Sequence, residues 1–160
     1  MKKLFQSPVG PLCIEANEES LLSITFNPSD IDPSESKKSN VIDHCIAELD
    51  QYFKGTLKTF TVPLLLNGTA FQNKVWSELT KIPYGKTISY SELALRLGDV
   101  KCIRAAGTAN GKNKLPIIIP CHRVIGKDGQ LVGFAGGLDK KEWLLKHEGI
   151  IKGAQMKIFG

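Results

Sequence analysis

A cysteine and a histidine stand side by side in the segment PCHRVIG, which covers residues 120–126. A thiol is mostly protonated at neutral pH and needs a nearby proton acceptor before it can act as a nucleophile. Cys121 and His122 could therefore be a nucleophile with its base, half of a metal site, or two ordinary core residues. The residue types alone leave these three interpretations open.

The apolar run before this pair, Leu115–Ile119, predicts a short buried strand that leads into extended backbone. Because successive side chains of an extended chain point to opposite sides, Cys121 and His122 would not touch directly. A bridging water could carry the thiol proton to the imidazole, which would then need a carboxylate to orient it. The spacing of residues in the sequence does not select one carboxylate for this role over the others. Glu148 ends a predicted helix, where its charge opposes the macrodipole, so it either has a specific role or is a solvated surface residue.

Composition limits the class of protein. The chain has 160 residues, enough for one full domain or two small ones. It has no apolar run long enough to span a membrane, and no apolar segment follows the first lysines as in a signal peptide. The four cysteines form no C-x-x-C pair, and Cys13, His44 and Cys45 show no zinc pattern. We expect a cytoplasmic protein with free thiols, no metal, no cofactor and no membrane partner.

The charge is unevenly distributed along the chain. Residues 1–67 carry 6 Lys and Arg against 9 Asp and Glu, whereas residues 68–160 carry 15 against 7. A basic second half favours a polyanionic partner such as nucleic acid, although lysines that merely keep a surface soluble would give the same balance.

The first 67 residues predict a small α/β unit. Two β-rich runs, Leu12–Ala16 and Leu21–Phe26, read as a hairpin, and a polar loop follows. Apolar residues from Ile42 to Phe53 recur at helical spacing. Residues 59–66 read as a strand or an extended linker, and the boundary falls at residues 67–69.

The second part reads as mostly helical. Thr69 with Gln72, and Ser89 with Glu92, predict two capping boxes, the first opening a helix whose core face runs from Phe71 to Ile82. A helix over Val100–Gly111 would complete a helix-turn-helix. Its small residues favour close approach to another surface, either a neighbouring helix or, with Arg104 beside them, a DNA groove. Asp139 is expected to cap the last helix.

Three segments, PYGKTISYSELA (83–94), IPCHRVIG (119–126) and GGLDKKEWLLKHEG (136–149), together resemble the O6-alkylguanine-DNA alkyltransferases. The resemblance covers residues 68–149 in order and spacing, and the Pro-Cys-His-Arg block in that context is highly specific. It implies a ribonuclease-H-like α/β domain over residues 1–67, then a mostly α domain over residues 68–160 with a winged-helix-like helix-turn-helix. It also implies a monomer that repairs O6-alkylguanine in double-stranded DNA, with O4-alkylthymine as a further candidate substrate.

The resemblance also implies roles for individual residues. Cys121 would accept the alkyl group irreversibly in a single turnover, with His122 acting through water and Glu148 and Asn113 supporting it. Tyr90, the carbonyls of Cys121 and Val124, Phe134 and Ala135 would bind the flipped base. Minor-groove contacts would come from seven residues, namely Tyr90, Ser91, Lys101, Arg104, Ala105, Gly107 and Lys127.

Three positions depart from patterns common in that family: Phe134 lacks a tyrosine hydroxyl, Ala135 replaces a serine, and Lys114 stands where proline is common. They concern how the protein handles bulky O6 adducts and free-base inhibitors, and they do not alter the reacting residues. The rival functions are a non-catalytic sensor of alkylated DNA, a cysteine hydrolase and a sequence-specific transcription factor. A sensor of this kind would lack the acceptor cysteine, which is present here.

Overall fold

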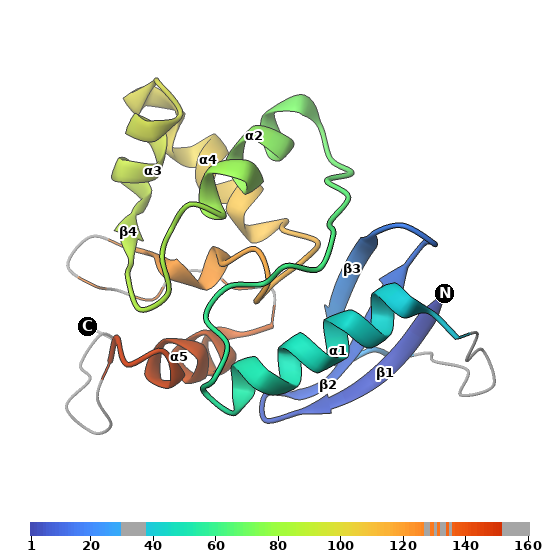
Figure 1. Ribbon diagram of the computed structural model, residues 1–160. Coiled ribbons are helices and arrows are strands. Elements are labelled where there is room, and N and C mark those ends of the chain that lie inside the picture. Colours follow the sequence, from blue (N-terminus) through green and yellow to red (C-terminus); the bar gives the residue numbers. More distant parts are fainter. Residues whose placement is uncertain (30–37, 127–128, 130, 132–133, 135, 152–160) are drawn as a thin grey trace. The chain divides into compact units, whose positions relative to one another are not determined.

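The computed structural model describes residues 1–29, 38–126, 129, 131, 134 and 136–151 (Figure 1). The chain divides into two compact units after Asn67. Within the described residues, no helix is both long and apolar enough to cross a membrane.

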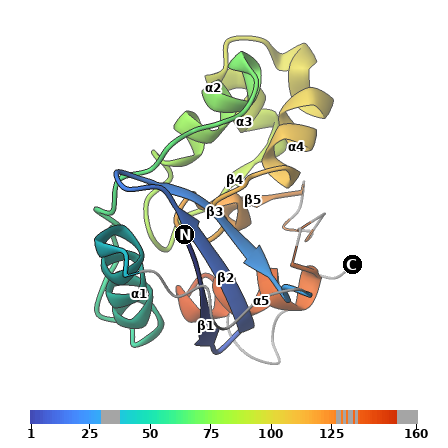
Figure 2. The same cartoon turned by 90° about the vertical axis from the view of Figure 1, so that its right-hand side faces the viewer.

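The N-terminal unit is a three-stranded antiparallel sheet with one helix packed on it (Figure 2). Its elements are β1 (Lys2–Ser7), β2 (Gly10–Ala16), β3 (Leu21–Phe26) and α1 (Asn40–Phe53). The hairpin and the helix are confirmed, and Ser39 caps the helix by accepting from the Ile42 amide. Strand β1 was not expected, because its side chains are mostly exposed and form no apolar run. Residues 59–66 form no strand: the segment bends at Thr59 and Val62 and makes one parallel bridge, between Leu21 and Leu64.

The C-terminal unit is mostly helical, so the predicted fold classes of both units are confirmed. Its elements are α2 (Ala70–Leu79), β4 (Ile88–Ser89), α3 (Tyr90–Arg96), η1 (Val100–Cys102), α4 (Ile103–Gly111), η2 (Cys121–Arg123), β5 (Val124–Ile125) and α5 (Leu138–His147). Helices α3 and α4 form the helix-turn-helix, and α4 packs against both α2 and α3. Helix α5 lies beside η2 (Figure 1).

The helix starts follow the local sequence. Thr69 and Gln72 make both bonds of the first capping box. The second predicted box is only half formed, because Ser89 accepts from the Glu92 amide but the Glu92 side chain pairs with Arg96. Val75, Leu79 and Ile82 of the expected core face are buried. Phe71 is 36% exposed, so its assignment to the core was wrong. It lies in the first turn, at the edge of the packed face.

Two of the predicted helix boundaries are wrong. Val100–Gly111 is not one helix, because the Asp99 side chain accepts from the Lys101 amide and closes a short 3-10 turn before α4 begins. Asp139 does not cap α5, which begins one residue earlier, after Gly137 at φ 99°. Asp139 lies in the first turn, where the helix macrodipole still stabilises a carboxylate.

The run Leu115–Ile119 is buried as expected but is not a strand. Pro116 has no amide hydrogen to give to a sheet, and Ile117 adopts φ 76°, a left-handed conformation that strains a β-branched residue. The Ile119 amide donates back to the Leu115 carbonyl at 2.9 Å. This turn therefore leads directly into η2.

Candidate functional site

The Cys–His pair lies in the turn η2, where Cys121 is 5% and His122 0% exposed. The backbone here is not extended as expected, because the Arg123 amide donates to the Pro120 carbonyl at 3.0 Å and closes a 3-10 turn. The two side chains still do not bond to each other. Nδ1 of His122 is buried, and no residue that the structure describes hydrogen-bonds to it.

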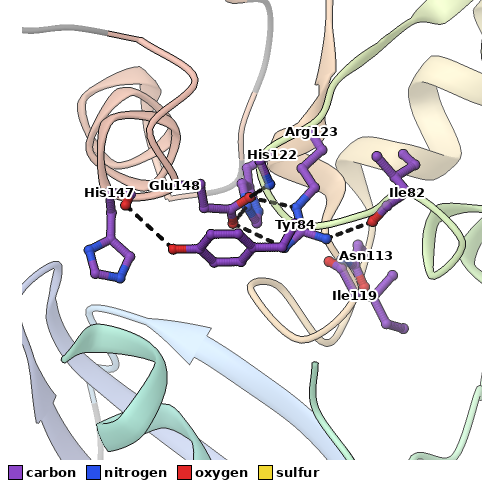
Figure 3. Close-up of polar contacts among 9 residues, drawn as sticks. Ile82, Tyr84, Asn113, Ile119, His122, Arg123, His147 and Glu148 are labelled. Carbon is purple, nitrogen blue, oxygen red and sulfur yellow. Dashed lines mark hydrogen bonds and ion pairs between the residues drawn. The ribbon is translucent and has the colours of Figure 1, made fainter. Parts of the chain in front are cut away.

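The carboxylate that meets the histidine is Glu148, the residue that ends α5 (Figure 3). His122 Nε2 lies 2.6 Å from Glu148 Oε2, and the Gly85 amide donates to Oε1 at 3.1 Å. Burial alone would raise the pKa of Glu148, but the hydrogen bonds from His122 and Arg123 and the charge of Arg123 outweigh it and hold that pKa well below its usual range. Since the carboxylate is ionised, Nε2 carries a proton and donates it, and Nδ1 of the neutral ring is an acceptor.

Asn113 braces the turn before the cysteine. Its Nδ2 donates to the Ile119 carbonyl at 2.8 Å, and its Oδ1 accepts from the Leu115 amide at 2.9 Å. Burial raises the pKa of the Cys121 thiol, while a hydrogen bond from Asn113 and the charge of Lys141 oppose that rise. The thiolate is therefore costly to form in the closed site and is stabilised by specific neighbours.

Tyr90 reaches the site through strand pairing. Strands β4 and β5 are parallel, with Ile88 opposite Val124, so the first residue of α3 lies beside the residues that follow η2. The Tyr90 ring packs on α4 at Gly107, where an added Cβ would lie 3.5 Å from the ring. Burial and the nearby Cys121 raise the pKa of Tyr90, and a side-chain hydrogen bond with Asn110 opposes them.

The two backbone carbonyls predicted to read a base already accept hydrogen bonds within the protein. The Cys121 carbonyl accepts from the Val124 amide and, at 3.3 Å, from Asn110 Nδ2, and the Val124 carbonyl accepts from Lys141 Nζ at 2.7 Å. A carbonyl oxygen has two lone pairs, so both of those on Cys121 are engaged, and a base read there would have to displace or share one of these donors.

Lys141 is a buried cation that the sequence interpretation missed. Its side chain is 0% exposed, its Nζ stands 5.9 Å from the centre of the Tyr90 ring, and burial lowers its pKa to about 8. A signal was present, because Lys141 and Glu148 share a helix face with the buried Leu144 and Leu145. Asn110 and Arg123 were also missed. Asn110 stands in a helix of small residues, and Arg123 follows the Cys–His pair, which drew the attention of the sequence interpretation.

The residues predicted to face DNA are mostly at the surface. Ser91, Lys101, Arg104 and Ala105 are exposed, and Gly107 is half-buried against Tyr90. Arg104 makes no hydrogen bond or ion pair with any residue in the described part of the chain. Phe134 is half-buried, whereas Lys127 and Ala135 lie outside the described residues.

Two family models match this chain over most of its length. Residues 1–66 match the 6-O-methylguanine DNA methyltransferase ribonuclease-like domain, and residues 70–150 match the DNA binding domain of the same family. The match agrees with the resemblance found in the sequence and with the α/β and helical character of the two units.

Individual relatives agree with the family models. A methylated-DNA–protein-cysteine methyltransferase of Methanosarcina acetivorans is 43% identical over 91% of this chain and 96% of the relative. The constitutive enzyme of that name from Bacillus subtilis is 39% identical over 91% of this chain and 93% of its own. The crystal structure of Mycobacterium tuberculosis O6-methylguanine methyltransferase has a TM-score of 0.83 at 38% identity, covering 99% of this chain and 98% of that one. A structure of the M. tuberculosis protein in complex with DNA has the same TM-score and identity, with 92% of each chain covered.

Proposed function

This chain belongs to the 6-O-methylguanine DNA methyltransferase family and acts as a methylated-DNA–protein-cysteine methyltransferase, and we propose that Cys121 is the cysteine that receives the alkyl group. The observation that carries this assignment is the buried thiol next to a histidine whose Nε2 is held by Glu148 and whose Nδ1 can accept a proton. The function is repair of alkylated DNA by direct reversal.

The chemical step is a displacement at carbon. A water passes the thiol proton of Cys121 to His122 Nδ1, and the thiolate attacks the alkyl carbon on guanine O6. The S–C bond forms as the C–O6 bond breaks, and the electron pair of that bond stays on guanine. Lys141 offsets the charge of the thiolate. The product thioether has no good leaving group, so the cysteine is not regenerated and each molecule acts once.

The remaining site residues hold the base and complete the proton balance. The guanine leaves the base stack to reach the buried thiol. The Tyr90 hydroxyl donates a proton to the departing base, and the carbonyls of Cys121 and Val124 accept from its exocyclic amine. Phe134 and Ala135 line the pocket. Support comes from the place of Tyr90 between α4 and Lys141.

We also propose that α4 enters the minor groove of double-stranded DNA, with Arg104 filling the gap left by the flipped base. The exposed Arg104 and the small residues after it support this, since they let the helix backbone come close. Contacts from Tyr90, Ser91, Lys101, Ala105, Gly107 and Lys127 would complete the interface. The two units would be separate domains, residues 1–67 and 68–160, of a monomer that has no membrane partner and works in the cytoplasm. Its four free cysteines suit that reducing compartment.

The stoichiometry of repair tests the function. The protein is mixed with increasing amounts of a duplex that carries one O6-methylguanine, and restored guanine is counted by digestion and chromatography. We expect one guanine per protein molecule, with no further repair at longer times. Several guanines per molecule would contradict a self-inactivating transfer, and tight binding without any restored guanine would identify a sensor.

Arg104→Ala is expected to slow repair of the duplex lesion by about 10- to 100-fold, because the flipped state loses the side chain that fills the stack. Reaction with free O6-benzylguanine, which needs no flipping, should change by less than about twofold. Single-turnover rates on both substrates are compared, with Lys54→Ala, which removes a charge from the other unit, as the control. An equal loss on both substrates would mean that Arg104 acts on the pocket instead.

A further inference from the structure

The arginine of the Pro-Cys-His-Arg block has no role in the mechanism above, yet it is buried in the site. Arg123 is 6% exposed. Its Nε donates to Glu148 Oε1 at 2.8 Å and its Nη2 to Oε2 at 3.1 Å, while Nη1 donates to the Ile82 carbonyl at 2.7 Å (Figure 3). The guanidinium also lies 5.7 Å from the centre of the Tyr84 ring. It thus joins the segment that follows α2, the cysteine turn and the residue that follows α5.

Glu148 is therefore shared between a base and a permanent cation. Four donors surround its carboxylate: Nε2 of His122, two nitrogens of Arg123, and the Gly85 amide. An arginine paired through two nitrogens cancels the carboxylate's charge and fixes its plane. A buried carboxylate without that partner would act on His122 with its full charge and favour the imidazolium.

The protonation state of His122 decides whether it can act as a base. An imidazolium has no lone pair, so it could not take the thiol proton at Nδ1. We propose that Arg123 is a positioning residue for the base: by neutralising Glu148 it keeps His122 uncharged, with the proton on Nε2 and Nδ1 open to accept one. The proposal rests on the proposed function of His122 and assigns the fourth residue of the block a role in it.

The charges around the site agree with this role. The charged groups that act on His122 are Glu148, Arg123 and Lys141, and Tyr84 faces the Arg123–Glu148 pair. Burial lowers the pKa of His122 most; Glu148 raises it, and the charges of Arg123 and Lys141 lower it again. Removing the Arg123 charge leaves the raising effect of Glu148 opposed only by burial and Lys141.

The test is the titration of His122 in the free protein, followed by ¹⁵N NMR of the imidazole and assigned by loss of the signal in His122→Gln. In the wild type we expect a neutral ring with the proton on Nε2 and a midpoint below the ordinary value of 6.5. In Arg123→Met the midpoint should rise by about 1–3 pH units. Arg123→Lys keeps the charge and should stay near the wild type. Arg123→Met/Glu148→Gln removes both charges and should bring the midpoint back down.

Alkyl transfer provides a second readout. In Arg123→Met, His122 would be protonated at neutral pH, so the rate falls there and recovers as the pH rises through the new midpoint. A merely structural role would lower the rate equally at every pH. An imidazolium at His122 in the wild type at pH 7, or a folded Arg123→Met with an unchanged midpoint, overturns the proposal. If Arg123→Met does not fold, Arg123→Gln, which keeps hydrogen-bond donors without the charge, takes its place, and its midpoint should rise in the same direction. Because the NMR uses no DNA, its outcome is independent of whether the alkyl transfer itself occurs as proposed.

Discussion

Cys121→Ser is expected to abolish alkyl transfer while leaving binding to the lesion intact. A serine hydroxyl ionises far less readily than a thiol, and the His122–Glu148 pair does not remove enough of that difference in a buried site. The serine is slightly smaller and should fit the turn, so the fold is retained. We expect the rate to fall below about one ten-thousandth of the wild type.

Intact mass and peptide mapping after exposure to an O6-methylguanine duplex measure this effect. The wild type should gain one methylene group on Cys121, and Cys121→Ser should gain none. Cys102→Ser is the matched control, because Cys102 is a half-buried thiol of the same unit that takes no part in the proposed chemistry. A methylene on another cysteine of Cys121→Ser would show that the acceptor was assigned wrongly. Unchanged wild-type mass with tight lesion binding would indicate a sensor.

Features that depend on a few neighbouring residues were predictable from the sequence. The Thr69 and Ser89 caps involve donors only three residues away, so the pattern of residue types contains the whole interaction. The same holds for the hairpin of the first unit and for the end of α5 at Gly149, which adopts φ 77°. The family resemblance rests on such local segments taken together.

The site depends on long-range contacts, which local pattern does not contain. His122 and Glu148 are 26 residues apart, and Arg123 reaches back 41 residues to the Ile82 carbonyl. The turn at Ile117 contradicts the local preference of a β-branched residue, because the packing of its buried neighbours overrides it. Lys141 illustrates the same limit, since lysine on a helix is nearly always solvated and only the packed unit buries this one.

Trp76→Ala is expected to give the largest loss of stability among single substitutions in the C-terminal unit. Trp76 is 1% exposed on α2, and its Nε1 donates to the Ala109 carbonyl of α4 at 2.8 Å. Truncation removes a large buried side chain and its hydrogen bond to that carbonyl, which keeps only the bond from the Lys112 amide at 3.2 Å. The cost is about 3–5 kcal/mol of the free energy of unfolding, a large part of the total for a domain of this size.

Chemical denaturation of each variant measures the loss, and the two tryptophans of the chain allow a matched comparison. Trp143→Ala is the control, because Trp143 is only half-buried and stacks on His147. It should cost clearly less than Trp76→Ala. Trp76→Phe keeps most of the ring but loses the hydrogen bond to Ala109, and should cost about 1–2 kcal/mol. Equal losses at both tryptophans would contradict the packing described here.

Since Ala109 lies on α4, the Trp76 bond also fixes the helix proposed to enter the groove. Trp76→Phe should therefore weaken duplex binding more than it slows the reaction with free O6-benzylguanine.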